Sequence, residues 1–189
     1  LYDRLHEIRM RFEVLKRDAE IRHWERVADG ADVRASRVQL DQEWLEIDSD
    51  FAFVASCNEG GESMDAARLD RLHQIAARTW QRTLDDRIGL SREERARKTA
   101  ASSEALPATE QVLADKPEHK IPHTPDDLIP ENNPWGFRLR VPAYKFDRGE
   151  LHNLSVARGT LTDEDRYIIN HHIVQTIMML SELPFPKHL

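Results

Sequence analysis

Apolar residues recur at helical spacing through the first part of the chain. Over residues 1–28 they alternate at intervals of four and three, which predicts a helix with a seam for a partner helix: Leu1, Leu5, Ile8, Phe12, Leu15 and Ala19. Asp29 and Gly30 are typical of a helix end. A second helix is expected from about Asp32 to Ser56, with the inward positions Val38, Leu45, Ile47, Phe51, Val54 and Ala55.

A third helix is expected after a glycine-containing turn. Ser63 would cap it, and it would run to about Asp85 with Leu69, Leu72, Ile75, Ala76, Trp80 and Thr83 inward. The capping-box sequence that begins at Ser91 predicts one more, shorter helix. The predicted fold class is therefore all-α, an antiparallel helical hairpin or small bundle followed by a long proline-rich irregular segment.

That proline-rich segment covers residues 99–150 and holds seven of the nine prolines. Proline removes a backbone donor and clashes with the preceding turn, so a long helix is excluded here. Residues 137–141 alternate like a short strand and predict an extended piece or half of a small hairpin. His119 and His123 have the spacing of a helical ligand pair, but the prolines around them do not permit that helix, so a metal role is not favoured.

The last helix is the best specified. Thr162 is a good N-cap, and the acidic residues 163–165 suit the positive end of the helix dipole. The helix should run from about Asp163 to Glu182 and end before Pro184. Its predicted buried face consists of Ile169, His172, Ile173, Thr176, Ile177 and Leu180, with His171 rotated by roughly 100° towards the edge.

Two interpretations of His172 are open from this pattern. A histidine on a buried helix face can be a packed core residue that makes one hydrogen bond. It can equally be a metal ligand, because a neutral imidazole held by packing coordinates divalent ions. One histidine does not make a metal site, so the spacing by itself leaves both open.

The order Gly159, Leu161, Thr162, then three acidic residues and Ile-x-x-His172 resembles the HD-GYP family of metal-dependent phosphohydrolases. The resemblance covers about residues 151–189, and residues 1–9 resemble a helix that follows the His-Asp motif in part of that family. The 189 residues contain neither a His-Asp pair nor a Gly-Tyr-Pro sequence. The resemblance thus implies an internal piece of such a domain.

Several expectations come from this resemblance alone. His172 would be a metal ligand, with His171 as the alternative, and Arg158 would meet a substrate phosphate; a solvated loop arginine is the other interpretation of Arg158. Two or three iron or manganese ions would complete the site in a longer bacterial signalling protein, with cyclic di-GMP as substrate and no activity in this piece alone. The catalytic residues are not identified. Residues 1–30 and 151–189 would form the core, with 31–98 as a helical insertion and 99–150 as the proline-rich segment.

Composition narrows the classes of partner and compartment. A net charge of −7 argues against nucleic acid as a main partner. The single cysteine, Cys57, fits a reducing compartment, and no run approaches the roughly 18 apolar residues of a membrane span. We therefore expect a cytoplasmic protein without a membrane segment in this chain.

A different class of function is also open. The chain could be a non-catalytic helical module, with the seam from Leu1 to Ala19 as the surface of a homodimer or of another protein contact. A degenerate family member that binds a nucleotide without cleaving it is a further alternative.

Overall fold

The computed structural model of the chain describes residues 2–59, 64–99 and 105–183. These residues form two compact units. Unit 1 consists of Leu1–Glu118 and Gly149–Thr160, and unit 2 of His119–Arg148 and Leu161–Leu189. Within the described ranges there are six α-helices and two small antiparallel sheets, which confirms a mostly helical fold.

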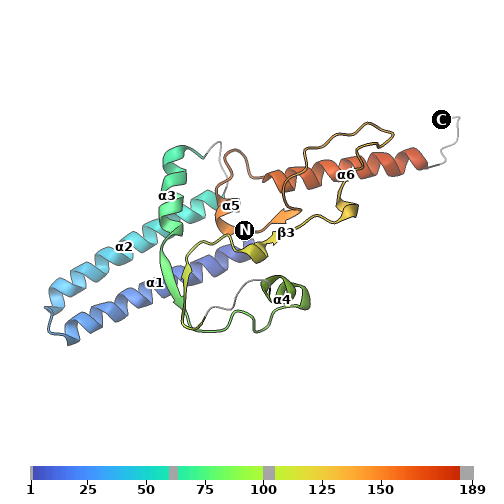
Figure 1. The fold of residues 1–189 in the computed structure, drawn as a ribbon. Helices are drawn as coiled ribbons and strands as arrows, with labels where there is room; N and C mark the ends of the chain where they lie inside the picture. The colour runs from blue at the N-terminus through green and yellow to red at the C-terminus, as the bar shows by residue number, and fades with distance from the viewer. Residues whose placement is uncertain (1, 60–63, 100–104, 184–189) are drawn as a thin grey trace. The chain divides into compact units, whose positions relative to one another are not determined.

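Unit 1 is built on a long hairpin of α1 (Tyr2–Ala28) and α2 (Val33–Asn58), which lie side by side (Figure 1). Gly30 turns the chain at a φ of 96°, and the Asp32 carboxylate caps α2 by accepting from the Ala35 amide at 2.8 Å. The predicted seam of α1 is buried at Ile8, Phe12 and Ala19. Its partner is α2 of the same chain.

The inward face of α2 was predicted correctly only in its second half. Ile47 and Val54 are buried, but Val38 and Leu45 are 66% and 69% exposed. Leu40 is buried instead, because Leu40, Ile47 and Val54 follow one another every seven residues and so share one side of the helix.

The third predicted helix is too long. The observed helix, α3 (Ala66–Ala76), is capped by Asp65; Ser63 lies outside the described residues. The chain then leaves the helix and forms β1 (Thr79–Arg82), which pairs antiparallel with β2 (Ala108–Gln111). Aromatic and β-branched residues favour a strand once a partner is present, and that partner comes from the proline-rich segment.

The remaining elements of unit 1 are α4 (Arg92–Thr99) and α5 (Glu150–Leu154). The capping box at Ser91 is confirmed, since Ser91 and Glu94 each accept the other's backbone N–H at 3.2 and 3.1 Å. The core joins α1, α2 and α3 to residues outside those helices; its buried members are Ile8, Phe12, Ile47, Val54, Leu72, Ile75, Ala76, Val112, Leu113 and Leu154. Val112 and Leu113 show that part of the proline-rich segment is core.

Unit 2 contains the C-terminal helix and a largely irregular chain. β3 (Lys120–Ile121) pairs antiparallel with β4 (Phe146–Asp147), with Ile121 opposite Phe146. Two 3₁₀ turns are present, η1 (Pro117–His119), which crosses the boundary of the units, and η2 (Pro125–Asp127). Residues 137–141 belong to no strand, so the half-hairpin alternative is wrong, and the alternative of an unpaired segment stays open. α6 (Asp163–Glu182) is the long element of this unit. No helix in the described ranges is long and apolar enough to cross a membrane.

Candidate functional site

α6 begins and ends where its sequence predicts. The Thr162 hydroxyl accepts the Asp165 amide at 3.2 Å, and the Asp165 carboxylate accepts the Thr162 amide at 3.1 Å. This reciprocal pair satisfies two donors that a helix start leaves open. The start of α6 is therefore held by its own side chains.

The face of α6 that the chain covers is not the predicted one. Tyr167 and Val174 are buried. The predicted stripe lies open instead, since Ile169, Ile173, Ile177 and Leu180 are between 41% and 54% exposed. α6 carries apolar residues on both sides, so helical spacing alone could not show which side the loops of unit 2 would cover.

Because the other face of α6 is covered, the two histidines exchange their expected environments: His171 lies towards the covered face and His172 on the exposed one. The ring of His171 stacks on Tyr167 with centroids 5.7 Å apart, and its Nε2 lies 3.3 Å from the Gln175 amide nitrogen. His172 is exposed beside Ile169 and Ile173 on the open stripe. Within the described residues no side chain hydrogen-bonds its imidazole; Thr176 donates to the His172 backbone carbonyl at 2.9 Å. His172 is thus the histidine whose ring nitrogens are accessible.

Tyr167 anchors the covered face to the loop around η2. Its hydroxyl donates to the Asp127 carbonyl at 2.8 Å, and burial together with the Asp127 charge raises its pKa. The Asp127 carboxylate accepts from Lys145 and from the amide and hydroxyl of Thr124, and these contacts lower the pKa of Asp127.

His123 belongs to the same cluster and packs edge-on against Tyr167, with ring centroids 5.6 Å apart. Its Nε2 lies 3.1 Å from the Pro142 carbonyl, which can only accept, so Nε2 carries the proton. His123 is therefore engaged with backbone and is not paired with His119.

Arg158, the third predicted site residue, is exposed in the loop after α5. The neighbouring Ala157 carbonyl accepts the Met64 amide at 3.0 Å, which ties this loop to the start of α3. Arg158 belongs to unit 1, whereas His171 and His172 belong to unit 2. The three predicted residues therefore do not form one cluster within a single unit.

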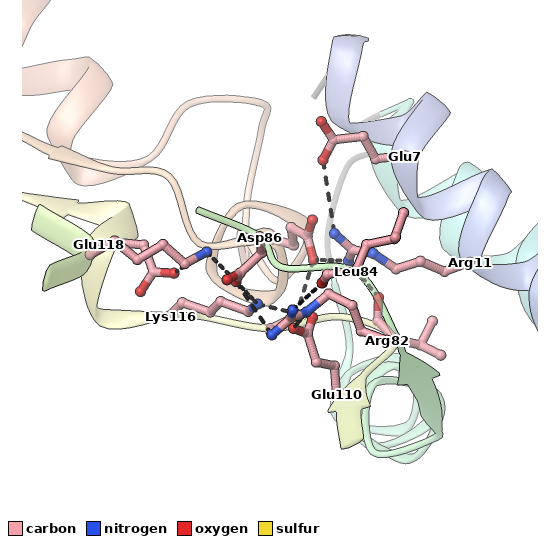
Figure 2. Close-up of polar contacts among 12 residues, drawn as sticks. Glu7, Arg11, Arg82, Leu84, Asp86, Glu110, Lys116 and Glu118 are labelled. Atoms are coloured by element: carbon pink, nitrogen blue, oxygen red, sulfur yellow. Dashed lines mark hydrogen bonds and ion pairs between the residues drawn. The ribbon is translucent and has the colours of Figure 1, made fainter. Parts of the chain in front are cut away.

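Unit 1 contains a charged pocket of about 420 Å³ that no motif in the sequence predicts. Figure 2 shows Arg82, Asp86, Glu110, Lys116 and Glu118 converging there from β1, β2 and the segments beside them. Arg82 pairs with Glu110, Lys116 pairs with Glu110 at 2.9 Å, and Lys98 of α4 pairs with Asp86 and with Glu118 at 3.3 Å. These side chains converge because β1 pairs with β2, and no local sequence pattern predicts that pairing.

The charged side chains of this cluster shift one another's pKa values. Burial is the largest influence on the pKa of Asp86 and of Glu110 and raises both, but hydrogen bonds and charges from Lys98, Arg82 and Lys116 outweigh it and lower them. For Lys98 the signs are opposite: burial lowers its pKa, but the contacts with Asp86 and Glu118 outweigh burial, so the pKa of Lys98 is raised. Each of these charged side chains has an opposite partner, so the arrangement is that of a stabilising network.

A second polar contact holds α5 to the core of unit 1. The Glu150 side chain, 3% exposed, accepts from Arg11 of α1 at 2.7 Å and from the Ala114 amide at 3.1 Å. Arg11 also donates to the Val112 carbonyl at 2.9 Å. A charge can be buried without a large cost only if it is paired and hydrogen-bonded, and the Glu150 carboxylate has both a charged and a backbone donor.

A metal centre needs converging ligands, and the described residues do not provide them. In residues 2–59, 64–99 and 105–183 no group of three or more histidine, cysteine, aspartate or glutamate side chains could hold an ion. His172 can contribute one imidazole at most. The described part of the chain therefore does not fit a bound metal by itself.

Comparison with known families gives one result. Residues 107–189 match the family model described as HD domain. The match supports an HD-domain phosphohydrolase family, whose members are typically metal-dependent, and it confirms the resemblance at this coarser level. It begins within the proline-rich segment and includes β2, the whole of unit 2 and the loop with Arg158. No curated protein and no solved structure matches the chain.

Proposed function

We propose that this chain is part of an HD-GYP-type phosphohydrolase that cleaves a phosphodiester bond of cyclic di-GMP. The observation that supports this most is the HD-domain match over residues 107–189, which contains the Leu-Thr-Asp-Glu-Asp helix start and His172. The substrate and the narrower family rest on the resemblance of that stretch. Iron or manganese is the metal that the resemblance favours.

His172 is the residue that we propose as a metal ligand. Its ring lies on an open apolar stripe of α6, where a covering segment could bring further ligands against it. His171 is the weaker alternative, because its ring is stacked on Tyr167 and hydrogen-bonded to Gln175. The remaining ligands would come from residues that the structure does not describe or from a longer protein, and the 189 residues alone should then be inactive.

Arg158 is proposed as a contact for a substrate phosphate. A guanidinium can bind two phosphate oxygens at once, which lysine cannot do. Its side chain is exposed in the loop after α5. We therefore expect Arg158 to affect substrate binding, and His172 to affect metal binding.

The test compares hydrolysis of cyclic di-GMP, a cyclic adenine dinucleotide and bis(p-nitrophenyl) phosphate by a protein that carries this chain within its natural flanks. The proposal predicts metal-dependent turnover that prefers cyclic di-GMP. Arg158→Ala should raise KM by about tenfold, whereas Arg34→Ala, an exposed arginine of α2, should not. If only bis(p-nitrophenyl) phosphate is hydrolysed, the phosphohydrolase activity stands but a cyclic dinucleotide is not the substrate. If none of the three compounds is hydrolysed, both parts of the proposal are wrong.

A further inference from the structure

α1 carries a second apolar stripe on the side opposite its buried seam. Its apolar members are Met10, Val14, Ile21, Trp24 and Ala28, and Arg17 occupies the remaining position of their spacing of four and three. Met10, Ile21 and Trp24 are 51%, 54% and 57% exposed. At 100° per residue this stripe lies about half a turn from Ile8, Phe12 and Ala19. It is a regular heptad surface that α2 does not cover.

Carboxylates line both edges of this stripe. Glu13 and Glu20 follow one edge, and Glu7, Asp18 and Glu25 follow the other. Two of these carboxylates have a cation beside them: Arg11 lies 3.8 Å from Glu7 while it also contacts Glu150 at 2.7 Å, and Arg17, within the stripe, pairs with Glu20 at 3.3 Å. Among the described residues, Glu13, Asp18 and Glu25 are in no ion pair, so the acidic charge that is left for a partner is theirs.

We propose that this stripe is a docking surface for a basic amphipathic helix of another protein. An apolar seam flanked by acidic positions matches a partner whose heptad edges carry lysine or arginine, because those edges set partner choice in helix pairs. A second copy of the chain is a poor match. In a parallel pair Glu13 would face Asp18 and Glu20 would face Glu25 of the other copy. In an antiparallel pair Glu13 would face Glu20 and Asp18 would face Asp18, and only Arg11 would meet an opposite charge, at Glu25.

The test uses the 189-residue chain and a synthetic helical probe. The probe is a peptide of about 21 residues with leucine and isoleucine at the seam and lysine at both flanking positions. One comparison peptide carries glutamate at the flanks, and the other is a scrambled sequence of equal charge. Binding is measured by calorimetry at two salt concentrations, and sedimentation of the chain alone measures self-association.

We expect the lysine peptide to bind and both comparison peptides to bind at least about tenfold more weakly. Ile21→Asp with Trp24→Asp should weaken binding about tenfold or more, and Glu13→Lys with Glu20→Lys should weaken it by roughly threefold to tenfold and remove its salt dependence. The matched control is Val38→Asp with Leu45→Asp, two equally exposed positions of α2, which should leave binding unchanged.

Three outcomes would overturn the proposal. The first is equal binding of the scrambled peptide, and the second is equal loss in the α2 control. The third is self-association that disappears with Trp24→Asp while no peptide binds, which would assign the stripe to a second copy. The surface variants are checked for an unchanged thermal transition, and none of these results depends on catalytic activity.

Discussion

At the scale of single residues, Glu110 holds the charge cluster of unit 1 together. Its side chain is 9% exposed and pairs with both Arg82 and Lys116. Without the Glu110 charge, Arg82 and Lys116 keep only their longer contacts with Asp86, at 3.6 and 4.0 Å. Glu110→Gln should therefore lower the free energy of unfolding by about 2–4 kcal/mol. Urea unfolding at neutral pH measures this. Glu93→Gln, on the surface of α4, is the control and should change stability by less than about 0.5 kcal/mol.

The same cluster predicts a loss of stability in acid. The pKa values of Asp86 and Glu110 lie below their ordinary values of 3.8 and 4.5 in the folded protein. A lowered pKa means that the unfolded chain binds more protons, so this stabilisation is present above the ordinary values and is lost as the pH falls through the folded ones. Unfolding curves between neutral pH and about pH 3 should show this fall, and Glu110→Gln should make it shallower. An identical fall in the variant would contradict the assignment.

The two histidines of α6 show what spacing can and cannot predict about a residue. The sequence places His171 and His172 on adjacent sides of one helix, and that holds. It does not tell which side is covered, because Tyr167 and Val174 offer an apolar side as well as Ile169 and Ile173. Tyr167 is buried because the Asp127 carbonyl accepts its hydroxyl, a contact 40 residues away in the chain that no local pattern contains.

At the scale of elements, the cap of α6 can be tested alone. Thr162→Ala removes the hydroxyl that accepts the Asp165 amide, whereas the backbone N–H of residue 162 can still donate to the Asp165 carboxylate. The expected cost is about 1 kcal/mol, seen as a lower thermal midpoint by circular dichroism. Thr160→Ala, two residues earlier and outside the helix, should leave the midpoint unchanged. Equal shifts in both variants would show that the cap contributes little.

The two sides of α1 should respond differently to truncation. Phe12 is 3% exposed and packs edge-on against Phe51, with ring centroids 5.4 Å apart. Phe12→Ala should cost about 3–5 kcal/mol in the free energy of unfolding because it leaves a cavity in the core. Met10→Ala, on the exposed stripe, should cost less than about 0.5 kcal/mol. Denaturant unfolding of both variants tests the orientation of the helix.

Helices with capping signals were predictable, and paired strands were not. Asp32, Ser91 and Thr162 mark helix starts that the structure confirms, because a cap is a contact within four residues. Helical spacing predicts a helix where β1 is observed, since Trp80 continues the spacing of Leu72 and Ile75. The pairing of β1 with β2 joins residues that are 26 to 32 positions apart in the chain, such as Trp80 and Glu110. Such a contact leaves no trace in helical periodicity.

At the scale of the whole molecule, the α1–α2 hairpin could be predicted, but the role of the proline-rich segment could not. Val112 and Leu113 are fully buried in the core of unit 1, although prolines surround them in sequence. Prolines exclude a long helix but do not prevent short strands or buried side chains. The HD-domain match also begins in this segment, so one family model covers both the second part of the proline-rich segment and α6.

We propose that α6 supplies one metal ligand, His172, to an HD-type phosphohydrolase. The most direct test is the metal content of a protein that carries this chain within its natural flanks, purified with iron or manganese and measured by mass spectrometry. His172→Ala should lower the bound metal and the hydrolysis of cyclic di-GMP by at least about tenfold. The control His73→Ala, an exposed histidine of α3, should retain both. Unchanged metal content and activity in His172→Ala would contradict the claim.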